Sequence, residues 1–288
     1  MKLILQAAPG SNPNHSTIGA VNAIAALAGA PAPEPTQPGS HVWRCDAALS
    51  TEPIRQAVAA AAFNAGIDAT FVQSGMRLAD FKLLVMDMDS TLITIECIDE
   101  IADMQGLKPQ VAAITEAAMR GELVFRDSLI QRVALLEGLD AGALQRVVDE
   151  RLQLSPGAEH MLAAIKAAGL KTLLVSGGFT FFTERMQARL GLDYTRSNTL
   201  EIVDGKLTGR VLGEIVDASA KRRTVESTCA LLGASPSQAI VMGDGANDLE
   251  MMSIAGMSVA FRAKPVVRQK ADVALNFVGL DGILALFE

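Results

Sequence analysis

Cysteine and long apolar runs are both scarce in this chain of 288 residues. There are three cysteines, Cys45, Cys97 and Cys229, and none forms a CxxC pair. This spacing excludes a disulfide framework and a cysteine-based zinc site, and it favours free thiols in a reducing compartment. No run of about 18 apolar residues occurs, and the opening MKLILQAAPG is too broken by polar residues and proline for a secretory signal. We therefore expect a cytoplasmic protein that does not act at a membrane.

The chain also lacks a basic surplus. Its 25 Lys and Arg residues face 32 Asp and Glu residues, giving a net charge of -7. This balance argues against a nucleic-acid partner, which normally binds to a basic surface. It does not exclude a small anion, because a few cations and backbone amides can dominate inside a cleft. Aromatic residues make up only 4% while half of the chain is apolar, a composition that suits helices packed on a parallel sheet.

Residues 1–78 are predicted to form a small α/β domain. Apolar runs indicate strands at 3–7, 41–49 and 68–73, and two Ala-rich segments indicate helices at 16–29 and 52–66. The stretch APAPEPTQPGS, which follows the first helix, is dense in proline and glycine and is predicted to be loop. No polar cluster in this part has the composition of an active site.

Residues 79–288 alternate between apolar strands and helices, which predicts a parallel sheet covered on both faces. Residues 95–153 are helical and interrupted by glycines, which indicates several short helices packed as a bundle. Residues 194–216 alternate around Asp204-Gly205, a strong hairpin signal. Three strands end in DMDST, SGG and GDGAND. Since ligands bind at the carboxyl ends of strands in such sheets, these ends are expected to meet at one site.

Asp87 and Asp89 directly follow the first of these strands. Two carboxylates two residues apart at a strand end face the same cavity. One can attack phosphorus while the other exchanges protons with the leaving group and water. A solvated Asp-Ser turn would have the same letters, so the pair alone leaves both interpretations open.

The segment Gly243 to Asp248 reads GDGAND after another strand. Its Asp244, placed beside Asp87, would help to hold a hard cation such as Mg²⁺, which prefers oxygen ligands. The segment begins like a dinucleotide-binding fingerprint, but Asp248 occupies the third glycine position and would repel a pyrophosphate. A helix-capping turn that begins at Asp248 is compatible with a metal site.

Ser176, Gly177 and Gly178 end a third strand, where a hydroxyl and exposed amides can form a small anion-binding nest. Lys221 lies near the start of a helix, from which an ammonium can reach a phosphate. Taken singly, the first is also an ordinary turn and the second also a surface lysine.

In this order, DMDST, SGG, the lysine and GDGAND resemble the motifs of the haloacid dehalogenase superfamily, from about residue 81 to the end of the sequence. Within it, DMDSTLITIECIDEIA, FRDSLIQRVALL, SGGF and GDGANDLEM are similar to the phosphoserine phosphatase family. The resemblance implies a Rossmann-like parallel sheet with a helical-bundle cap inserted after its first strand, at about 95–153. It also implies that residues 1–78 form an ACT-like domain for regulation or dimerisation, although the sequence shows one strand between the helices where that fold has two.

The resemblance further implies site roles. Asp87 would be the nucleophile and Asp89 the acid and base, with Mg²⁺ on Asp87, the carbonyl of Asp89 and Asp244. The implied substrate-binding residues are Ser176, Gly177, Lys221 and Asn247 around the phosphate, Glu96 for the ammonium group and Arg132 for the carboxylate. The implied supporting residues are Asp248, Gly178, Met119 and Phe125.

These roles suit phosphoserine, because a carboxylate matches its ammonium group and the planar fork of an arginine matches its carboxylate. Without the resemblance, Glu96 would be interpreted as a helix-start residue and Arg132 as a surface residue of an amphipathic helix. The implied activity is magnesium-dependent hydrolysis of O-phospho-L-serine through an aspartyl phosphate, the last step of serine biosynthesis. Two alternatives stay open: a phosphatase or phosphotransferase for another small phosphate monoester, and an amino-acid sensor on an inactive scaffold. Intact Asp87, Asp89, Lys221 and Asp244 oppose the sensor.

Overall fold

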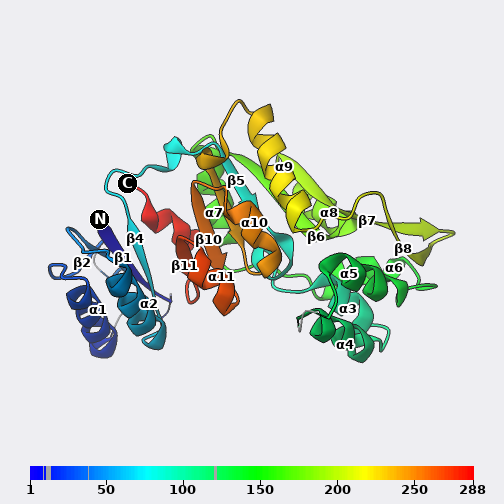
Figure 1. Cartoon of the computed structure of the whole chain (residues 1–288), viewed down its shortest axis with the longest axis horizontal. Helices are drawn as coiled ribbons and strands as arrows, with labels where there is room; N and C mark the ends of the chain where they lie inside the picture. Colours follow the sequence, from blue (N-terminus) through cyan, green and yellow to red (C-terminus); the bar gives the residue numbers. More distant parts are fainter. Residues whose placement is uncertain (9, 11–13, 38, 120–121) are drawn as a thin grey trace.

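The computed structural model describes residues 1–8, 10, 14–37, 39–119 and 122–288. A small sheet domain lies at one end, a large sheet with its helices lies in the middle, and a group of helices lies at the other end (Figure 1). Within the described residues, no helix combines the length and the apolar composition needed to cross a lipid bilayer.

The N-terminal domain has the element order β-α-β-β-α-β, which is that of ferredoxin-like folds. Its elements are β1 (Lys2–Ala7), α1 (His15–Leu27), β2 (Glu34–Pro35), β3 (Val42–Cys45), α2 (Glu52–Asn64) and β4 (Ile67–Val72). The sheet is antiparallel, with the strand order β2-β3-β1-β4. Leu3 and Leu5 of β1 pack with Ile24 of α1 and Val58 of α2, so both helices cover one face.

The prediction that the proline-rich stretch is only loop is wrong. Glu34 and Pro35 form the short strand β2, which pairs with Arg44 and Trp43 of β3. Proline is tolerated there because β2 is an edge strand and its missing N–H removes no ladder bond. The second strand between the two helices is therefore present, while the regulatory role suggested by the ACT-like resemblance stays a prediction.

The other face of this small sheet is packed against the rest of the chain. Ile4 and Val72 share a buried apolar cluster with Leu280 and Ile283 of the 3₁₀ helix η5 (Leu280–Leu286). Because this face is buried, the N-terminal domain is packed against the large sheet and is not connected to it by a linker alone.

The large sheet has seven strands in the order β11-β10-β9-β5-β6-β7-β8, and all neighbours are parallel except β7 and β8. These strands are β5 (Leu83–Met86), β6 (Lys171–Phe179), β7 (Tyr194–Val203), β8 (Lys206–Leu212), β9 (Ala239–Gly243), β10 (Met257–Phe261) and β11 (Val273–Leu275). The helices that cover them are α7 (Ala158–Ala167), α8 (Thr180–Leu190), α9 (Ala218–Leu231), α10 (Leu249–Met252) and α11 (Pro265–Lys270). Leu83 and Val85 of β5 face α9, α10 and α11, whereas Leu84 and Met86 face α7 and α8, so the predicted doubly covered sheet is confirmed.

Residues 95–153 contain the predicted short helices between β5 and α7 (Figure 1). They are α3 (Cys97–Asp103), α4 (Lys108–Met119), α5 (Phe125–Ala134) and α6 (Gly142–Glu150), and we call them the cap. The predicted hairpin is formed by β7 and β8, and Leu207 of β8 exchanges backbone hydrogen bonds with Gly138 and Leu139 of the cap. The cap is thus attached to the sheet through the hairpin as well as through its own ends.

Candidate active site

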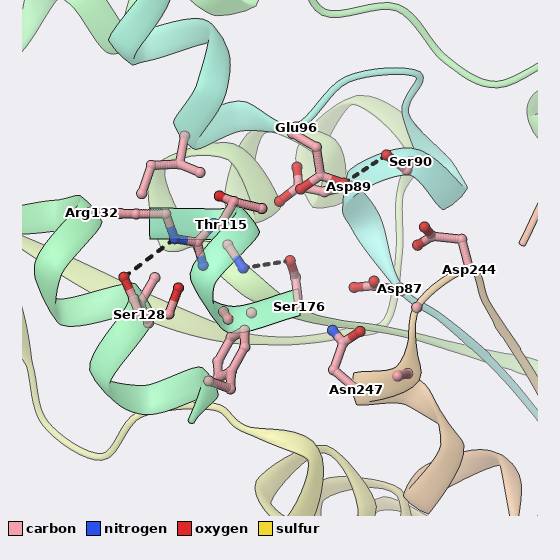
Figure 2. Close-up of a pocket in the computed structure, with 18 of the residues that line it drawn as sticks. Asp87, Asp89, Ser90, Glu96, Thr115, Ser128, Arg132, Ser176, Asp244 and Asn247 are labelled. Carbon is pink, nitrogen blue, oxygen red and sulfur yellow. Dashed lines mark hydrogen bonds between the residues drawn. The ribbon is translucent and has the colours of Figure 1, made fainter. Parts of the chain in front are cut away.

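A cavity of about 790 Å³ lies between the cap and the carboxyl ends of β5, β6, β9 and β10. Figure 2 shows Asp87, Asp244 and Asn247 at one end of it and Arg132 and Thr115 at the other. The strand ends that were expected to meet do so, because β5 lies between β6 and β9 in the sheet. We call the two regions the phosphate end and the cap end.

Asp87 lies directly beyond β5 and is buried, with 5% of its surface exposed. Its Oδ1 accepts a hydrogen bond from the backbone N–H of Met88 at 2.8 Å and is 2.8 Å from the ammonium of Lys221. Lys221 is fully buried in α9 and also contacts Asp248 Oδ1 at 2.7 Å. Burial, and next the charge of Asp248, raise the pKa of Asp87 well above its ordinary value, and Lys221 opposes this rise. Lys221 is therefore the neighbour that favours the ionised form of this desolvated carboxylate.

Asp87, Asp244 and Asp248 each offer a carboxylate oxygen, and the three oxygens lie within 4.8 Å of one another. Burial, followed by the charges of Asp248 and Glu96, raises the pKa of Asp244 to about 7. Three crowded acids repel one another, and a hard divalent cation with oxygen ligands would relieve that repulsion. The residues present thus fit a metal ion.

Asp248 differs from the other two acids in having both oxygens occupied by protein donors. Oδ1 contacts Lys221, and Oδ2 accepts a hydrogen bond from the N–H of Gly245 at 3.1 Å. It therefore anchors the lysine and the GDGAND turn, and it leaves Asp87 and Asp244 as the carboxylates with free oxygens for an ion. Thr91 Oγ1 lies 3.5 Å from Asp244 Oδ1 and restrains that carboxylate from the β5 side.

Asp89 points into the cavity from the turn after β5. Its Oδ1 accepts a hydrogen bond from the backbone N–H of Cys97, the first residue of α3, at 3.3 Å. Burial, and then the charge of Glu96, raise the pKa of Asp89 to about 7, while the hydrogen bonds from Cys97 lower it. A carboxyl group with a pKa near the working pH can both give and take a proton, which is the requirement for a general acid and base.

Ser176, Gly177 and Gly178 lie at the end of β6 and line the cavity. The N–H of Gly178 donates to Ser176 Oγ at 2.8 Å, so this amide is directed to the serine and the hydroxyl proton stays free to donate to an anion. The carbonyl of Gly177 accepts from the side chain of Asn198, whose Oδ1 accepts from the N–H of Val216, both at 2.8 Å. Asn198 thus fixes the turn from β7.

At the cap end, Arg132 of α5 is half-buried and lines the cavity near Glu96 (Figure 2). Desolvation lowers the pKa of Arg132, while Asp99, Glu96 and Asp89 oppose this effect. Desolvation also raises the pKa of Glu96, although its carboxylate accepts a hydrogen bond from Ser90 Oγ at 2.7 Å. An acid and a guanidinium therefore face the same space, as recognition of an amino acid requires.

The remaining predicted site residues differ in where the structure places them. Phe125 lines the cavity, and its ring would lie 2.9 Å from a Cβ placed on Gly177, so it packs directly on the end of β6. Asn247 also lines the cavity. Met119 is the last residue of α4, and its side chain lies outside the described part of the structure.

Sequence reasoning missed three residues that shape this site. Asn198 belongs to no recognisable motif. Its role depends on the position of β7 beside the Gly177 carbonyl, which the sequence around Asn198 does not indicate. Ser90 was included only as a motif letter, although its left-handed φ of 56° directs its hydroxyl to Glu96. Lys264 lines the cavity beyond β10, and the signal for it was a further strand end, AFRAK, at the same edge of the sheet.

Comparison with known proteins gives one consistent family. Residues 81–256 match the haloacid dehalogenase-like hydrolases. The phosphoserine phosphatase of Albidiferax ferrireducens is 58% identical over 218 residues, which cover 74% of this chain and 92% of the relative. That of a Polaromonas species is 57% identical over 226 residues, which cover 77% and 96%.

Solved structures extend the likeness. A haloacid dehalogenase family hydrolase from Salmonella enterica serovar Typhi has a TM-score of 0.88 and 32% identity, and it covers 100% of this chain and 99% of its own. A substrate-bound phosphoserine phosphatase has a TM-score of 0.68 and 38% identity, with 72% of this chain and 99% of its own covered. With more than half of its length matched and relatives well above 30% identity, the chain belongs to the haloacid dehalogenase-like hydrolases and, among them, to the phosphoserine phosphatase family.

Proposed function

We propose that the protein hydrolyses O-phospho-L-serine to serine and phosphate, with Asp87 as the nucleophile. The observation that carries the proposal is the arrangement of one cavity with two chemically different ends. The phosphate end holds an acid paired with a buried lysine, and the cap end holds the facing Glu96 and Arg132. A phosphorylated zwitterion matches both ends at once.

Binding would place the two ends of the substrate as follows. The guanidinium of Arg132 pairs with the substrate carboxylate, and Glu96, held by Ser90, accepts the ammonium group. Ser176, the amide of Gly177 and Asn247 contact the phosphoryl oxygens. The serine ester oxygen then lies between the ends, within reach of Asp89.

Chemistry then needs two displacements at phosphorus. A carboxylate oxygen of Asp87 attacks, the bond from phosphorus to the serine oxygen breaks, and protonated Asp89 gives that oxygen its proton. Water, deprotonated by the same Asp89, then attacks the aspartyl phosphate and frees phosphate, which restores both carboxyl groups. A pKa of about 7 for Asp89 suits this double role.

We further propose Mg²⁺ as the ion of the acidic cluster. Asp87, Asp244 and the backbone carbonyl of Asp89 would hold it, and it would offset the negative charge that otherwise opposes the meeting of a carboxylate and a phosphate. Lys221 supplies a fixed positive charge at the same place from within the protein.

The first test is steady-state hydrolysis of phosphoserine with Mg²⁺, compared with other phosphorylated metabolites and with an aryl phosphate. Phosphoserine should have the highest kcat/KM, and Asp87→Asn should remove turnover. A higher kcat/KM for another metabolite would favour the alternative, a phosphatase for a different small ester. Ordinary turnover by Asp87→Asn would refute the nucleophile assignment.

The second test addresses recognition. Arg132→Ala should lower kcat/KM for phosphoserine by about 10²-fold, because one buried charge-assisted contact contributes about 2–3 kcal/mol, and it should leave the aryl phosphate nearly unaffected. Arg126→Ala is the matched control, since Arg126 is exposed on the same helix and does not line the cavity. Equal losses for both substrates would remove Arg132 from substrate recognition.

Three further predictions from the sequence stay proposals: a cytoplasmic location, a role in serine biosynthesis and homodimer formation through the N-terminal domain. Size measurement of the full chain tests the last of these.

A further inference from the structure

Lys264 occupies a position at the cavity that the mechanism above leaves unused. It follows β10, which is the neighbour of β9 in the sheet, so both strands end at the same edge. The backbone N–H of Lys264 donates to the carbonyl of Asp244 at 3.1 Å. Its side chain is exposed and lines the cavity beside the GDGAND turn. The lysine is therefore held at the phosphate end of the cavity by a fixed piece of backbone.

The charge around the cavity makes this position notable. Five acids line it: Asp87, Asp89, Glu96, Asp99 and Asp244. Among the described residues, the cationic side chains that line it are Arg132 and Lys264. Arg132 lies at the cap end, and Lys221 is buried behind Asp87 and Asp248, so Lys264 is the solvent-accessible cation of the phosphate end. Without Lys264, a phosphate dianion would approach a cavity entrance that is lined mainly by acids.

We propose that Lys264 is an electrostatic positioning residue, which draws the phosphate dianion to the phosphate end of the cavity and at the same time weakens metal binding there. This inference rests on the proposed function, because it assumes an anionic phosphate ester as the substrate.

The surroundings of the side chain support this role. Lys264 lines the same cavity as Glu96 and Asp244, and its backbone is bonded to that of Asp244, so its positive charge faces the two acids that border the cavity from the cap side and the metal side. A positive charge on the wall of the cavity that Asp244 also lines should repel a divalent cation and attract a dianion. Lys264 should thus strengthen substrate binding and weaken metal binding. A residue that only supports the fold would not affect the two in opposite directions.

A purely structural role is the competing explanation. Lys264 is the N-cap residue of α11, with extended backbone and Pro265 following it. Its hydrogen bond to Asp244 is made by the backbone, so a glutamine at this position keeps that contact and removes only the charge. Lys264→Gln and Lys264→Glu therefore test the charge directly. Lys270→Gln, an exposed lysine at the other end of the same helix that does not line the cavity, is the matched control.

The kinetic experiment measures kcat and kcat/KM for phosphoserine as a function of ionic strength. At about 0.01 M salt, where charges act over about 30 Å, Lys264→Gln should lower kcat/KM roughly threefold to tenfold, and Lys264→Glu should lower it further. At about 1 M salt, where the range is about 3 Å, the variants should approach the wild type. The kcat value should change by less than about twofold, because a charge at the rim of a binding site acts mainly on association.

The second experiment measures the affinity for Mg²⁺ without substrate, using the metal-dependent rise in Tm as the signal. Lys264→Gln should bind Mg²⁺ about twofold to fivefold more tightly than the wild type, and Lys270→Gln should not differ from it. A merely structural role predicts weaker binding or no change.

The outcomes separate the two proposals. A wild type that does not hydrolyse phosphoserine overturns the proposed function. An active wild type whose Lys264→Gln variant has the same salt dependence of kcat/KM and the same Mg²⁺ affinity overturns the role of Lys264 alone. Weaker binding of both substrate and metal would also overturn it, because it would show damage to the turn.

Discussion

Gly178 leaves almost no room beside the residue that we assign as general acid. A Cβ at this position would lie 2.7 Å from Asp89 Oδ2 and 3.1 Å from both Met88 Cε and Ser176 Oγ. Gly178→Ala should therefore displace the Asp89 carboxylate and lower kcat by about 10²-fold, because a displacement of about 1 Å in a catalytic group costs that much. KM for phosphoserine should change less than kcat, since Ser176 is crowded less closely than Asp89 and the cap end is untouched. Steady-state kinetics checks both values.

Gly19→Ala is the control for that substitution. Gly19 is exposed in α1, and a Cβ there would meet nothing within 4 Å. Its kcat should equal that of the wild type, while its free energy of unfolding should rise by up to about 1 kcal/mol because alanine favours a helix. If Gly178→Ala kept wild-type kcat as well, the position of Asp89 would not depend on β6.

At the scale of elements, Asn198 links three segments that meet below the phosphate end. From β7, it bonds the carbonyl of Gly177 near the end of β6 and the N–H of Val216 before α9, and it is 1% exposed. Asn198→Ala would leave a buried N–H without a partner, so the free energy of unfolding should fall by about 1–3 kcal/mol. KM should rise because the turn at Gly177 loses its support.

Denaturant unfolding and steady-state kinetics test this, with Asn64→Ala, an exposed residue at the end of α2, as the control. The control should stay within about 0.5 kcal/mol of the wild type. An Asn198→Ala protein with unchanged stability and unchanged KM would show that the turn holds its conformation without this side chain.

The elements differ in how far the sequence could predict them. The ends of β5, β6 and β9 could be predicted because each apolar strand sequence changes there to polar or glycine residues, and this change is visible in the local sequence. The turn of the β7–β8 hairpin was also local: Asp204 and Gly205 have φ values of 50° and 74°, which the Asp-Gly pair allows. The strand β2 was missed because its pairing with β3 overrides the loop preference of its prolines. Asn198 and Lys264 were missed because their partners are set by strand order, which residue type does not record.

At the scale of the whole molecule, the acidic cluster couples stability to pH and metal. Asp89 and Asp244 have pKa values raised to about 7, whereas in the unfolded chain such groups titrate near pH 4. Between these values the folded chain binds more protons than the unfolded chain, so these groups lower the free energy of unfolding as the pH rises from about 4 to about 7. A divalent cation would bind the deprotonated acids, so the proposed Mg²⁺ should reverse the loss.

We therefore expect Mg²⁺ to raise Tm more at about pH 8 than at about pH 5.5, because fewer protons compete for the site. At a concentration 100 times its Kd, the ion should add about 2.7 kcal/mol. Asp244→Asn should lose most of this increment at either pH. An equal increment in the wild type and in Asp244→Asn would place the metal elsewhere.

Docking of the N-terminal domain depends on one buried acid. Asp68 of β4 is 2% exposed, and its carboxylate accepts hydrogen bonds from the backbone N–H groups of Asn276, Phe277 and Val278 beyond β11. Asp68→Ala would leave these buried N–H groups in the domain interface without a hydrogen-bond acceptor. The free energy of unfolding should therefore fall by roughly 3 kcal/mol or more. Since β11 is the edge strand farthest from β5 on its side of the sheet, kcat should stay within about twofold of the wild type.

Asp46→Ala is the matched control in the same domain, because the Asp46 side chain is 76% exposed and lies 3.9 Å from Lys2. Its effect on stability should stay below about 0.5 kcal/mol, as for most exposed ion pairs. Limited proteolysis should cut Asp68→Ala, but not Asp46→Ala, between β4 and β5, because the undocked domain would expose that connection. If Asp68→Ala unfolded at the wild-type denaturant concentration and resisted the protease equally, apolar packing of Ile4 and Val72 on η5 would be sufficient to hold the domain in place.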